Sequence, residues 1–505
     1  MRFIYDNLAV IYVALVASLM AWVFGGTRGG LLVPLVPWLM LFMLEIIFIF
    51  PQKYESETTR EARQRVWRKM KKDPLVWTAV GFLALLAIPF INNGLCPGCD
   101  AELIAQGVKA APPAKFLPFC VDRMDHLNVF LWFVTALSAM IATKHCLRRR
   151  GKRLLLEMIV WNGFALAILG FVQNATGAPG PLWVPMKTKW ATAPFFSTFG
   201  YANMAGDYFT TLFGLSAALW RHRYEAVRTE RNADNEHDSG KVRGVFWRKN
   251  YLLIPAAVFF FAALNTLSRA AILLVSALAV LFFLHAFVSF LSRMSKARRV
   301  KSGTLSLFVL GVIVFSASVF APREIRKEVD SLDANGVLDR VTSKGQYHAR
   351  VATEVWRDNI LFGCGGWGYK HFCVTKMTEA ELKGMQDVGG TNVHNDYLQF
   401  LAEHGVVGLG ALVALVVLLV APVGSVWRKL IAASRFAKPR DKPPRPVQIF
   451  ALPAPVFSIL LTALATFIHG FGDCPFRSPA VLTLFYVMLA AMPGFLPKLP
   501  EAPAK

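Results

Sequence analysis

The sequence predicts an all-α polytopic membrane protein with about twelve transmembrane helices. Of its 505 residues, 55% are hydrophobic and only 17% are charged, whereas a soluble domain carries about 25% charged residues. Aromatic residues make up 13% of the chain and include 40 Phe, which suits lipid and interfacial surfaces. This composition excludes a disordered chain, a coiled coil, a collagen-like fibre and a typical cytosolic enzyme.

Twelve apolar runs approach the length that a membrane span needs, because a bilayer core about 30 Å thick requires roughly 20 residues of helix. Backbone amides in lipid must be hydrogen-bonded within their own segment, so each run is expected to be helical. The run from 251 to 290 is too long for one span and is divided at Ser268 and Arg269. The predicted spans are 8–24, 31–50, 75–91, 127–143, 154–172, 205–220, 251–267, 270–290, 305–321, 405–425, 450–469 and 478–494.

The distribution of Lys and Arg predicts the orientation, because cytoplasmic loops are enriched in both. Of the 55 such residues, 37 lie at the termini or in loops after even-numbered spans, and ten of the other 18 lie in the long segment 322–404. Both termini are therefore predicted to be cytoplasmic, with residues 1–24 retained as a helix rather than cleaved as a signal peptide. The net charge of +23 is interpreted as this topology signal plus contact with anionic lipids, and nucleic acid is not an expected partner.

Three regions follow from this topology: 1–321 with spans 1–9, 322–404 as a large extracytoplasmic loop between spans 9 and 10, and 405–505 with spans 10–12 and a cytoplasmic tail. The loop is far longer than a connection between helices needs. It holds ten Lys and Arg against twelve Asp and Glu. It is therefore the expected place for chemistry.

Two helices are predicted inside this loop. Residues 346–361 place Tyr347, Val351, Val355 and Ile360 on one apolar face. Arg350, Glu354 and Arg357 share one stripe of the same helix. Glycines at 363, 365, 366 and 368 end it, and Thr391 and Asn392 are expected to cap a second helix over 393–404.

Six cysteines fall on the predicted external side, and four interpretations of them stay open. An even number is consistent with disulfides in an oxidising compartment. Cys96 and Cys99 form a CxxC pair that also suits redox chemistry, and with Cys120 and His126 they also suit a zinc site. Unpaired thiols are the fourth alternative. The six are Cys96, Cys99, Cys120, Cys364, Cys373 and Cys474.

Residues 392–405 (NVHNDYLQFLAEHG) resemble the signature of the O-antigen ligase and polymerase superfamily, which is His-Asn-x-Tyr-Leu followed by Glu-x-Gly before a membrane helix. Residues 356–365 (WRDNILFGCG) are similar to the family's stretch ending in Gly-x-Gly, with Ile360 in place of its usual proline. Three further pieces resemble family motifs in the expected order: 199–203 (FGYAN), 267–269 (LSR) and 469–479 (HGFGDCPFRSP).

The resemblance implies a membrane glycosyltransferase, with 322–404 as its catalytic loop. Such an enzyme moves a glycan from a polyprenyl (undecaprenyl) diphosphate carrier to an acceptor hydroxyl at the periplasmic face of the bacterial inner membrane. The implied partners are this lipid-linked donor, a glycan or lipid A-core acceptor, and membrane lipids; no cofactor and no metal are implied. An O-antigen ligase, an exopolysaccharide polymerase and a protein O-oligosaccharyltransferase share these motifs.

His394 is the candidate general base, because a neutral imidazole accepts a proton near pH 7. A place in the first turn of a helix would disfavour its charged form. Arg269 and Arg350 are the candidate catalytic cations, since guanidinium groups form forked hydrogen bonds to phosphate. Arg269 also interrupts two apolar runs, where an ionisable residue indicates function. The candidate substrate-binding residues are Tyr201, Asn203, Arg340, Arg357, Asn395, Tyr397 and Arg477.

Each candidate also has a structural interpretation. His394 suits a loop that bonds its own backbone, Arg269 suits a side chain that reaches the membrane interface, and Arg477 suits an ion pair at an external turn. At the level of the whole chain, a twelve-helix secondary transporter is the second alternative, although it should hold its polar residues near the membrane midplane. A scaffold in an envelope assembly is a third.

Overall fold

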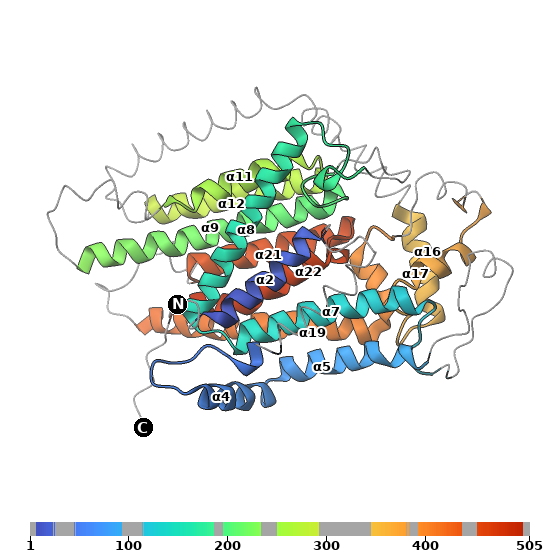
Figure 1. The fold of residues 1–505 in the computed structure, drawn as a ribbon, viewed down its shortest axis with the longest axis horizontal. Helices are drawn as coiled ribbons and strands as arrows, with labels where there is room; N and C mark the ends of the chain where they lie inside the picture. The colour runs from blue at the N-terminus through green and yellow to red at the C-terminus, as the bar shows by residue number, and fades with distance from the viewer. Residues whose placement is uncertain are drawn as a thin grey trace.

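The computed structural model describes residues 7–23, 25, 45, 47–92, 114, 116–185, 195–233, 250–291, 345–379, 381–382, 392–436 and 452–497. These residues form helices and no strands (Figure 1). The α-helices are α2 (Leu8–Trp22), α4 (Thr59–Lys71), α5 (Pro74–Ala87), α7 (Arg123–His145), α8 (Arg149–Ala175), α9 (Ala202–Ala233), α11 (Leu253–Asn265), α12 (Arg269–Leu291), α16 (Gly345–Asp358), α17 (Tyr369–Phe372), α19 (Asp396–Phe436), α21 (Ala454–Gly472) and α22 (Pro479–Ala491). Short 3-10 helices are η2 (Ile88–Phe90), η3 (Pro181–Trp183), η7 (Cys373–Thr375), η8 (Pro475–Arg477) and η9 (Met492–Phe495).

Five of these helices are long and apolar enough to cross a membrane, namely α7, α8, α12, α19 and α21. A sixth is obtained if α4 and the helix from Pro74 to Phe90, which meet at 74°, count as one bent span. This confirms a polytopic α-helical membrane protein. Helices also occupy ten of the twelve predicted runs, while 305–321 and most of 31–50 lie outside the described residues. The count of twelve spans stays a prediction.

The long helices run side by side, with α9 packed against α11 and α21, α7 against α22, and α5 against α19 (Figure 1). One end of the bundle carries α16, α17, the first residues of α9 and α19, and the last residues of α21; we call it the α16 end. At the opposite end, the α7–α8 junction holds six Lys and Arg over residues 144–153. The α7–α8 junction and the α16 end therefore lie at opposite ends of the bundle, and the orientation of the chain in the membrane stays a prediction.

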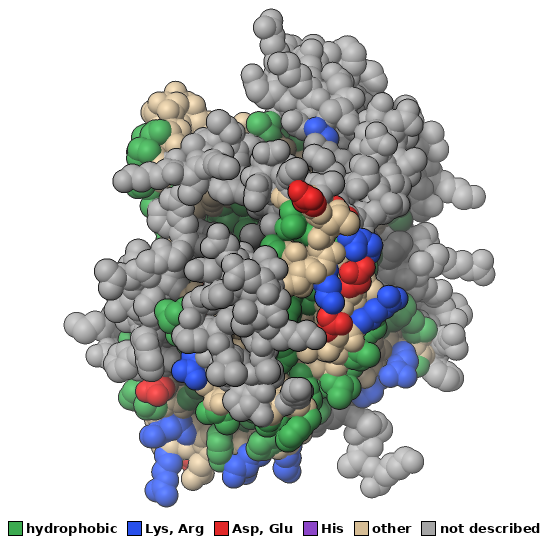
Figure 2. Space-filling model, turned by 90° about the vertical axis from the view of Figure 1, so that its right-hand side faces the viewer, with side chains coloured by type: hydrophobic (Ala, Val, Ile, Leu, Met, Phe, Trp, Pro, Cys, Tyr) green, Lys and Arg blue, Asp and Glu red, His purple; other side chains and the backbone are tan. Residues whose placement is uncertain are grey.

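Charges on the α16 end are largely paired. Arg350 Nη2 lies 2.8 Å from Glu381 Oε2, Lys376 Nζ lies 2.7 Å from Asp358 Oδ2, and Lys370 Nζ lies 2.5 Å from Asp125 Oδ2. Figure 2 looks onto this end and shows acidic and basic side chains next to one another. Its described surface is therefore of mixed sign.

The two glycine motifs of the predicted signature lie next to each other. Their backbones form hydrogen bonds with one another at a break in α19. Gly405 has φ +64° and ψ −172°, a conformation essentially reserved for glycine. The break leaves backbone groups without helical partners, and the segment 360–365 supplies them. Cys364 N and Gly365 N donate to the carbonyls of Ala402 and Glu403 (3.0 and 2.8 Å), while Val406 N and Val407 N donate to the carbonyls of Ile360 and Leu361 (3.0 and 3.1 Å). The Gly-x-Gly and Glu-x-Gly motifs therefore have a structural role in this protein.

Three predictions for the loop segment need correction. The first helix ends at Asp358, so Val351 and Val355 are buried on its apolar face while Ile360, beyond its end, is 50% exposed. The second helix begins at Asp396, and it is Asn395 that caps it, because its Oδ1 accepts from Tyr397 N and Leu398 N, both at 3.1 Å. Asn392 instead accepts from the side chain of Gln399. A cap must lie directly before the first helical turn, where its side chain can accept from the free N–H groups of that turn. Asn395 has this position and Asn392 does not.

Two tight turns bring more of the predicted residues to the α16 end. Thr198 Oγ1 donates to Ala21 O at 2.6 Å, which anchors the segment leading into α9. Between α11 and α12, Leu267 has φ +58° and Ser268 Oγ caps α12 by accepting from Ala271 N at 3.3 Å. A Cβ on Gly206 of α9 would lie only 2.5 Å from Ala271 Cβ. This close approach holds the start of α12 against the first turn of α9.

Candidate active site

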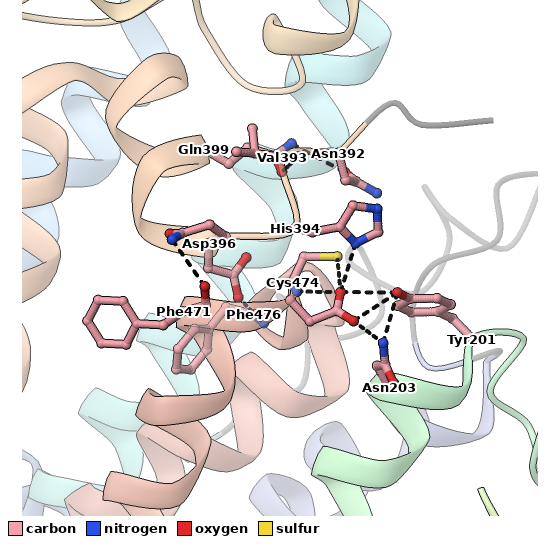
Figure 3. A network of polar contacts seen from close by, with 12 residues as sticks. Tyr201, Asn203, Asn392, Val393, His394, Asp396, Gln399, Phe471, Cys474 and Phe476 are labelled. Carbon is pink, nitrogen blue, oxygen red and sulfur yellow. Dashed lines mark hydrogen bonds and ion pairs between the residues drawn. The ribbon is translucent and has the colours of Figure 1, made fainter. Parts of the chain in front are cut away.

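The carboxylate of Asp473 is the centre of a polar network at the α16 end. Figure 3 labels its partners Tyr201, Asn203 and His394. Tyr201 Oη donates to it at 2.9 and 3.1 Å, and Asn203 Nδ2 donates to Oδ2. His394 Nδ1 lies 3.3 Å from Oδ1. The network therefore joins three residues that the sequence predicts for the site, Tyr201, Asn203 and His394, to Asp473, which lies 79 positions after His394.

The position of Asp473 is fixed by its own backbone. Helix α21 ends at Gly472, and Asp473 follows in an extended conformation. Cys474 N donates to Asp473 Oδ1 at 2.7 Å, and Asp396 N donates to Asp473 O at 3.2 Å. Asp396 Oδ2 in turn accepts from Phe476 N at 2.8 Å. These bonds join the start of α19 to the end of α21 and hold the carboxylate toward His394.

His394 is the most accessible member of the network. Its side chain is 45% exposed, whereas that of Asp473 is 7% exposed. Its backbone has φ +53°, an uncommon value for a residue other than glycine. Such strain is sustained only where the surroundings enforce it, and here Asn395 and Asp396 on one side and Val393 on the other are all held by hydrogen bonds.

Asp473 raises the pKa of His394, mainly through their hydrogen bond and further through its negative charge; burial opposes this. The same hydrogen bond and the charge of His394 lower the pKa of Asp473 against the effect of burial. The expected suppression of the charged imidazole by a helix dipole is therefore wrong. His394 precedes α19 instead of lying in its first turn, and the neighbouring carboxylate dominates.

Arg269 is the first residue of α12, and its side chain is partly buried. The turn between α11 and α12, which directly precedes Arg269, is connected to His394 through packing and hydrogen bonds. The turn packs on Gly206, which lies one helical turn from Asn203, and Asn203 bonds Asp473. The structure thus places Arg269 at the same end of the bundle as the network.

Arg350 and Arg357 lie on α16 and make no contact with the Asp473 network among the described interactions. Arg350 is bound to Glu354 at 2.8 Å and to Glu381 at 2.8 and 2.9 Å. His348, two residues earlier on α16, has its ring centre 5.9 Å from that of His394, and residues two apart do not share a helix face. Arg357 is exposed at the end of α16, and Arg340 lies outside the described residues.

Arg477 is buried and paired with an acid. Its Nη2 lies 2.6 Å from Glu403 Oε2, with the two side chains 2% and 0% exposed. Its guanidinium also lies over the rings of Trp367 and Phe400, at 5.1 and 5.3 Å. This geometry favours the structural interpretation of Arg477 over direct substrate binding.

Asn395 and Tyr397 also make structural contacts. Asn395 caps α19 and its Nδ2 donates to Phe471 O at 3.2 Å. Tyr397 Oη donates to Phe467 O at 2.6 Å. Both bonds join α19 to α21, so these residues position the neighbouring His394.

Asp473 is the main residue that the candidate list lacks. The motif HGFGDCP contains it, but nothing in the local pattern shows that this carboxylate faces residue 394 rather than Arg477 four positions later. His348 is absent from the list for the same reason, because its proximity to His394 depends on how α16 folds over α19.

Four of the six cysteines that are predicted to be external are described, and all four are free thiols. Cys120, Cys364, Cys373 and Cys474 are all buried and unpaired, so the disulfide interpretation is wrong for these four; Cys96 and Cys99 lie outside the described residues. Zinc binding through His126 is also wrong, because both of its ring nitrogens are used: Nδ1 accepts from Gly366 N at 2.9 Å and Nε2 bonds Leu86 O at 2.7 Å. A different cluster has the spacing of metal ligands, namely His394, Asp473 and Cys474.

An apolar pocket lies directly beside the network. Tyr397 and Phe400 of α19 and Phe467 of α21 form its wall near the site, and it continues along the helices toward Val416. Phe133, Leu409, Leu412, Val413, Phe476, Leu482, Phe485 and Tyr486 complete the lining. A polar site and a hydrocarbon-like pocket are thus adjacent.

Fold and site together define a polytopic α-helical membrane protein with a polar site at one end of its helix bundle. Residues 254–413 match the family model described as O-Antigen ligase. This match contains Arg269, Arg350 and His394, and it confirms the predicted resemblance to the O-antigen ligase/polymerase superfamily over this part of the chain. A comparison with curated proteins found no match.

Proposed function

We propose that this protein is a membrane glycosyltransferase that moves a glycan from a polyprenyl diphosphate carrier to an acceptor hydroxyl at the periplasmic face of the bacterial inner membrane. The observation that carries the proposal is the half-exposed His394 bonded to the buried Asp473. Abstraction of a proton from an incoming alcohol requires a base with one accessible atom and a fixed orientation. The exposed part of the imidazole provides the first, and the hydrogen bond to Asp473 provides the second.

In the proposed reaction, Nε2 of neutral His394 accepts the proton of the acceptor hydroxyl. The acceptor oxygen forms a new bond to the anomeric carbon, and the bond from that carbon to the diphosphate oxygen breaks. Asp473 accepts a hydrogen bond from Nδ1–H, which leaves Nε2 as the free acceptor, and it stabilises the imidazolium that forms. Tyr201 and Asn203 hold the Asp473 carboxylate through their own hydrogen bonds.

The leaving diphosphate needs positive charge, and Arg269 is the proposed source. Its position at the start of α12, within reach of the same end of the bundle, supports this role. Arg350 is a weaker candidate, because two carboxylates already share its guanidinium. The pocket lined by Tyr397, Phe400 and Phe467 is the proposed site for the first isoprene units of the carrier, since its lining is apolar and it adjoins the polar network.

The predicted catalytic loop is therefore only one part of the proposed site. Of the central residues, His394 comes from the loop, while Asp473 follows α21, and Tyr201 and Asn203 lie at the start of α9. The ends of membrane helices contribute as much as the loop does.

Complementation of a deletion strain tests the function and separates its finer alternatives. Loss of a ligase leaves the polymer unattached to its lipid acceptor, whereas loss of a polymerase leaves single repeat units; both are visible when envelope glycans are separated on a gel. His394→Ala is expected to behave like the deletion at a matched protein level. Normal attachment and normal chain length with His394→Ala would refute the proposed base.

Arg269 has a separate test. Arg269→Ala removes the proposed diphosphate contact, and Arg269→Lys keeps the charge but loses the forked donor geometry. We expect both variants to lower transfer at saturating acceptor and to weaken donor binding. Full activity of Arg269→Ala would remove this residue from the mechanism while leaving the His394 proposal intact.

A further inference from the structure

A nitrogen, an oxygen and a sulfur atom converge at the centre of the site. The candidate ligand atoms of His394, Asp473 and Cys474 all lie within 4.8 Å of one another. His394 Nδ1 is 3.3 Å from Asp473 Oδ1, and Cys474 Sγ is 3.2 Å from the same oxygen. Two of the three residues are consecutive, and the third is 79 positions away.

These spacings fit a tetrahedral zinc ion. With metal–ligand distances of about 2.0–2.3 Å, the edges of such a tetrahedron are about 3.3–3.7 Å. Two of the three ligand pairs are already within a few tenths of an ångström of that range. An imidazole, a carboxylate and a thiol are together a ligand set typical of zinc and unlike the all-oxygen sets of Mg²⁺ and Ca²⁺.

The cluster also has an entry side. Asp473 and Cys474 are buried, but the His394 side chain is 45% exposed, so an ion reaches the cluster from that face. With three protein ligands, the fourth position is left for water. Cys373 offers a contrast at the same end of the bundle, because it is a buried free thiol in a separate apolar cluster with Val351, Val355 and Tyr369.

We propose that His394, Asp473 and Cys474 form a binding site for a thiol-seeking divalent cation such as Zn²⁺, and that binding inhibits the protein. The inhibitory part rests on the proposed function. An ion on Nδ1 displaces the hydrogen bond to Asp473 and moves the imidazole proton to Nε2, while the Cys474 thiol releases its proton to solvent. Nε2 then carries a hydrogen and no longer accepts one from the acceptor hydroxyl.

Binding is tested directly with Co²⁺ as a spectroscopic substitute for zinc on the full chain in detergent. The expected result is one bound Co²⁺ with a thiolate-to-cobalt charge-transfer absorption, displaced by Zn²⁺. Cys474→Ser keeps a hydroxyl donor beside Asp473 but lacks the soft ligand, so the absorption disappears and Co²⁺ affinity falls by at least about tenfold. The matched control, Cys373→Ser, keeps both.

A second variant covers the case in which Cys474→Ser does not fold. His394→Ala changes an exposed side chain and removes one ligand, so it too is expected to lose the absorption. Wild-type protein without a cobalt–thiolate band, or an unchanged band in whichever of the two variants folds, overturns the proposed site.

Measurements of transfer activity then distinguish metal binding from the inhibition that it is proposed to cause. Zn²⁺ is expected to inhibit the wild type and a chelator to restore it, while any residual activity of Cys474→Ser is insensitive at the same Zn²⁺ concentration. Metal binding without inhibition contradicts His394 as the base but leaves the ion site standing. If the wild type is active, His394→Ala is inactive and no metal binds, the proposed ion site is contradicted and His394 remains the proposed base.

Discussion

Two histidine–aspartate pairs meet at the end of α21, and they differ in exposure. His469 Nδ1 lies 2.9 Å from Asp207 Oδ1, and both side chains are fully buried. Four residues further on, Asp473 bonds His394, whose side chain is 45% exposed. The first pair joins α21 to α9 within the bundle, whereas the second lies where the helices end.

The two pairs have the same chemistry but different access to solvent. A fully enclosed imidazole has no room for a reacting hydroxyl, so the His469–Asp207 pair contributes to the packing of α9 against α21. A half-exposed imidazole keeps one ring nitrogen accessible. Exposure, and not the presence of a histidine and a carboxylate, therefore selects His394 as the candidate base.

The largest expected effect concerns the buried pair. His469→Ala leaves the Asp207 carboxylate without its partner in a buried position, where its Oδ2 already has no hydrogen bond. Breaking a buried pair costs about 3–5 kcal/mol. Thermal unfolding in detergent is expected to show strong destabilisation for His469→Ala and almost none for His394→Ala. Equal melting of the two variants would abolish the distinction between the pairs.

The break in α19 gives the next largest effect. Gly405→Ala would place a Cβ 2.2 Å from Leu361 O in a backbone conformation that other residues avoid, at a cost of at least about 1–3 kcal/mol. The yield of folded protein is expected to fall, with the activity per folded molecule less affected. The matched control is Gly410→Ala on the same helix, where an added Cβ meets no atom within 4 Å. Similar yields for the two variants would show that the α19 break is not needed.

The exposed pair has a signature in pH. Asp473 raises the pKa of His394, and the base must be neutral, so wild-type activity falls as the pH drops below this raised value. Asp473→Asn removes the cause, and the acid limb of the pH–rate profile is expected to move to lower pH. The maximal rate should fall by at least about tenfold because the imidazole is no longer oriented. An acid limb at the wild-type position would contradict the pairing.

The smallest effect is expected at Arg350. Its exposed ion pairs with Glu354 and Glu381 contribute about 1 kcal/mol or less, and its side chain lies on the face of α16 away from His348. Arg350→Ala should therefore retain activity within a few-fold of wild type in a donor titration. A loss as large as that of Arg269→Ala would contradict this ranking and make Arg350 an equal candidate for the catalytic cation.

The sequence predicted the all-helical membrane fold well because apolar runs and their polar flanks are local signals. It also predicted Tyr201, Asn203 and His394, which the structure joins. It failed where the answer depends on packing between distant segments. Nothing near Arg477 shows that Glu403 neutralises it, and nothing near Asp473 shows that it faces His394.

The glycine motifs illustrate the same limit. Their spacing identifies a turn and a helix start, but their shared task, which is to supply hydrogen bonds to each other's backbone, appears only when segments 360–365 and 402–407 lie together. The glycine motifs therefore shape the backbone that precedes and follows the candidate site.

The most direct measurement compares glycan transfer by purified wild-type, His394→Ala and His394→Gln proteins, using a lipid-linked donor and equal amounts of folded protein. Loss of a general base typically costs about 10²–10⁴-fold in rate, and we expect both variants to fall by at least about 100-fold while still binding donor. A rate within a few-fold of wild type for either variant would contradict the assignment of His394 as the base.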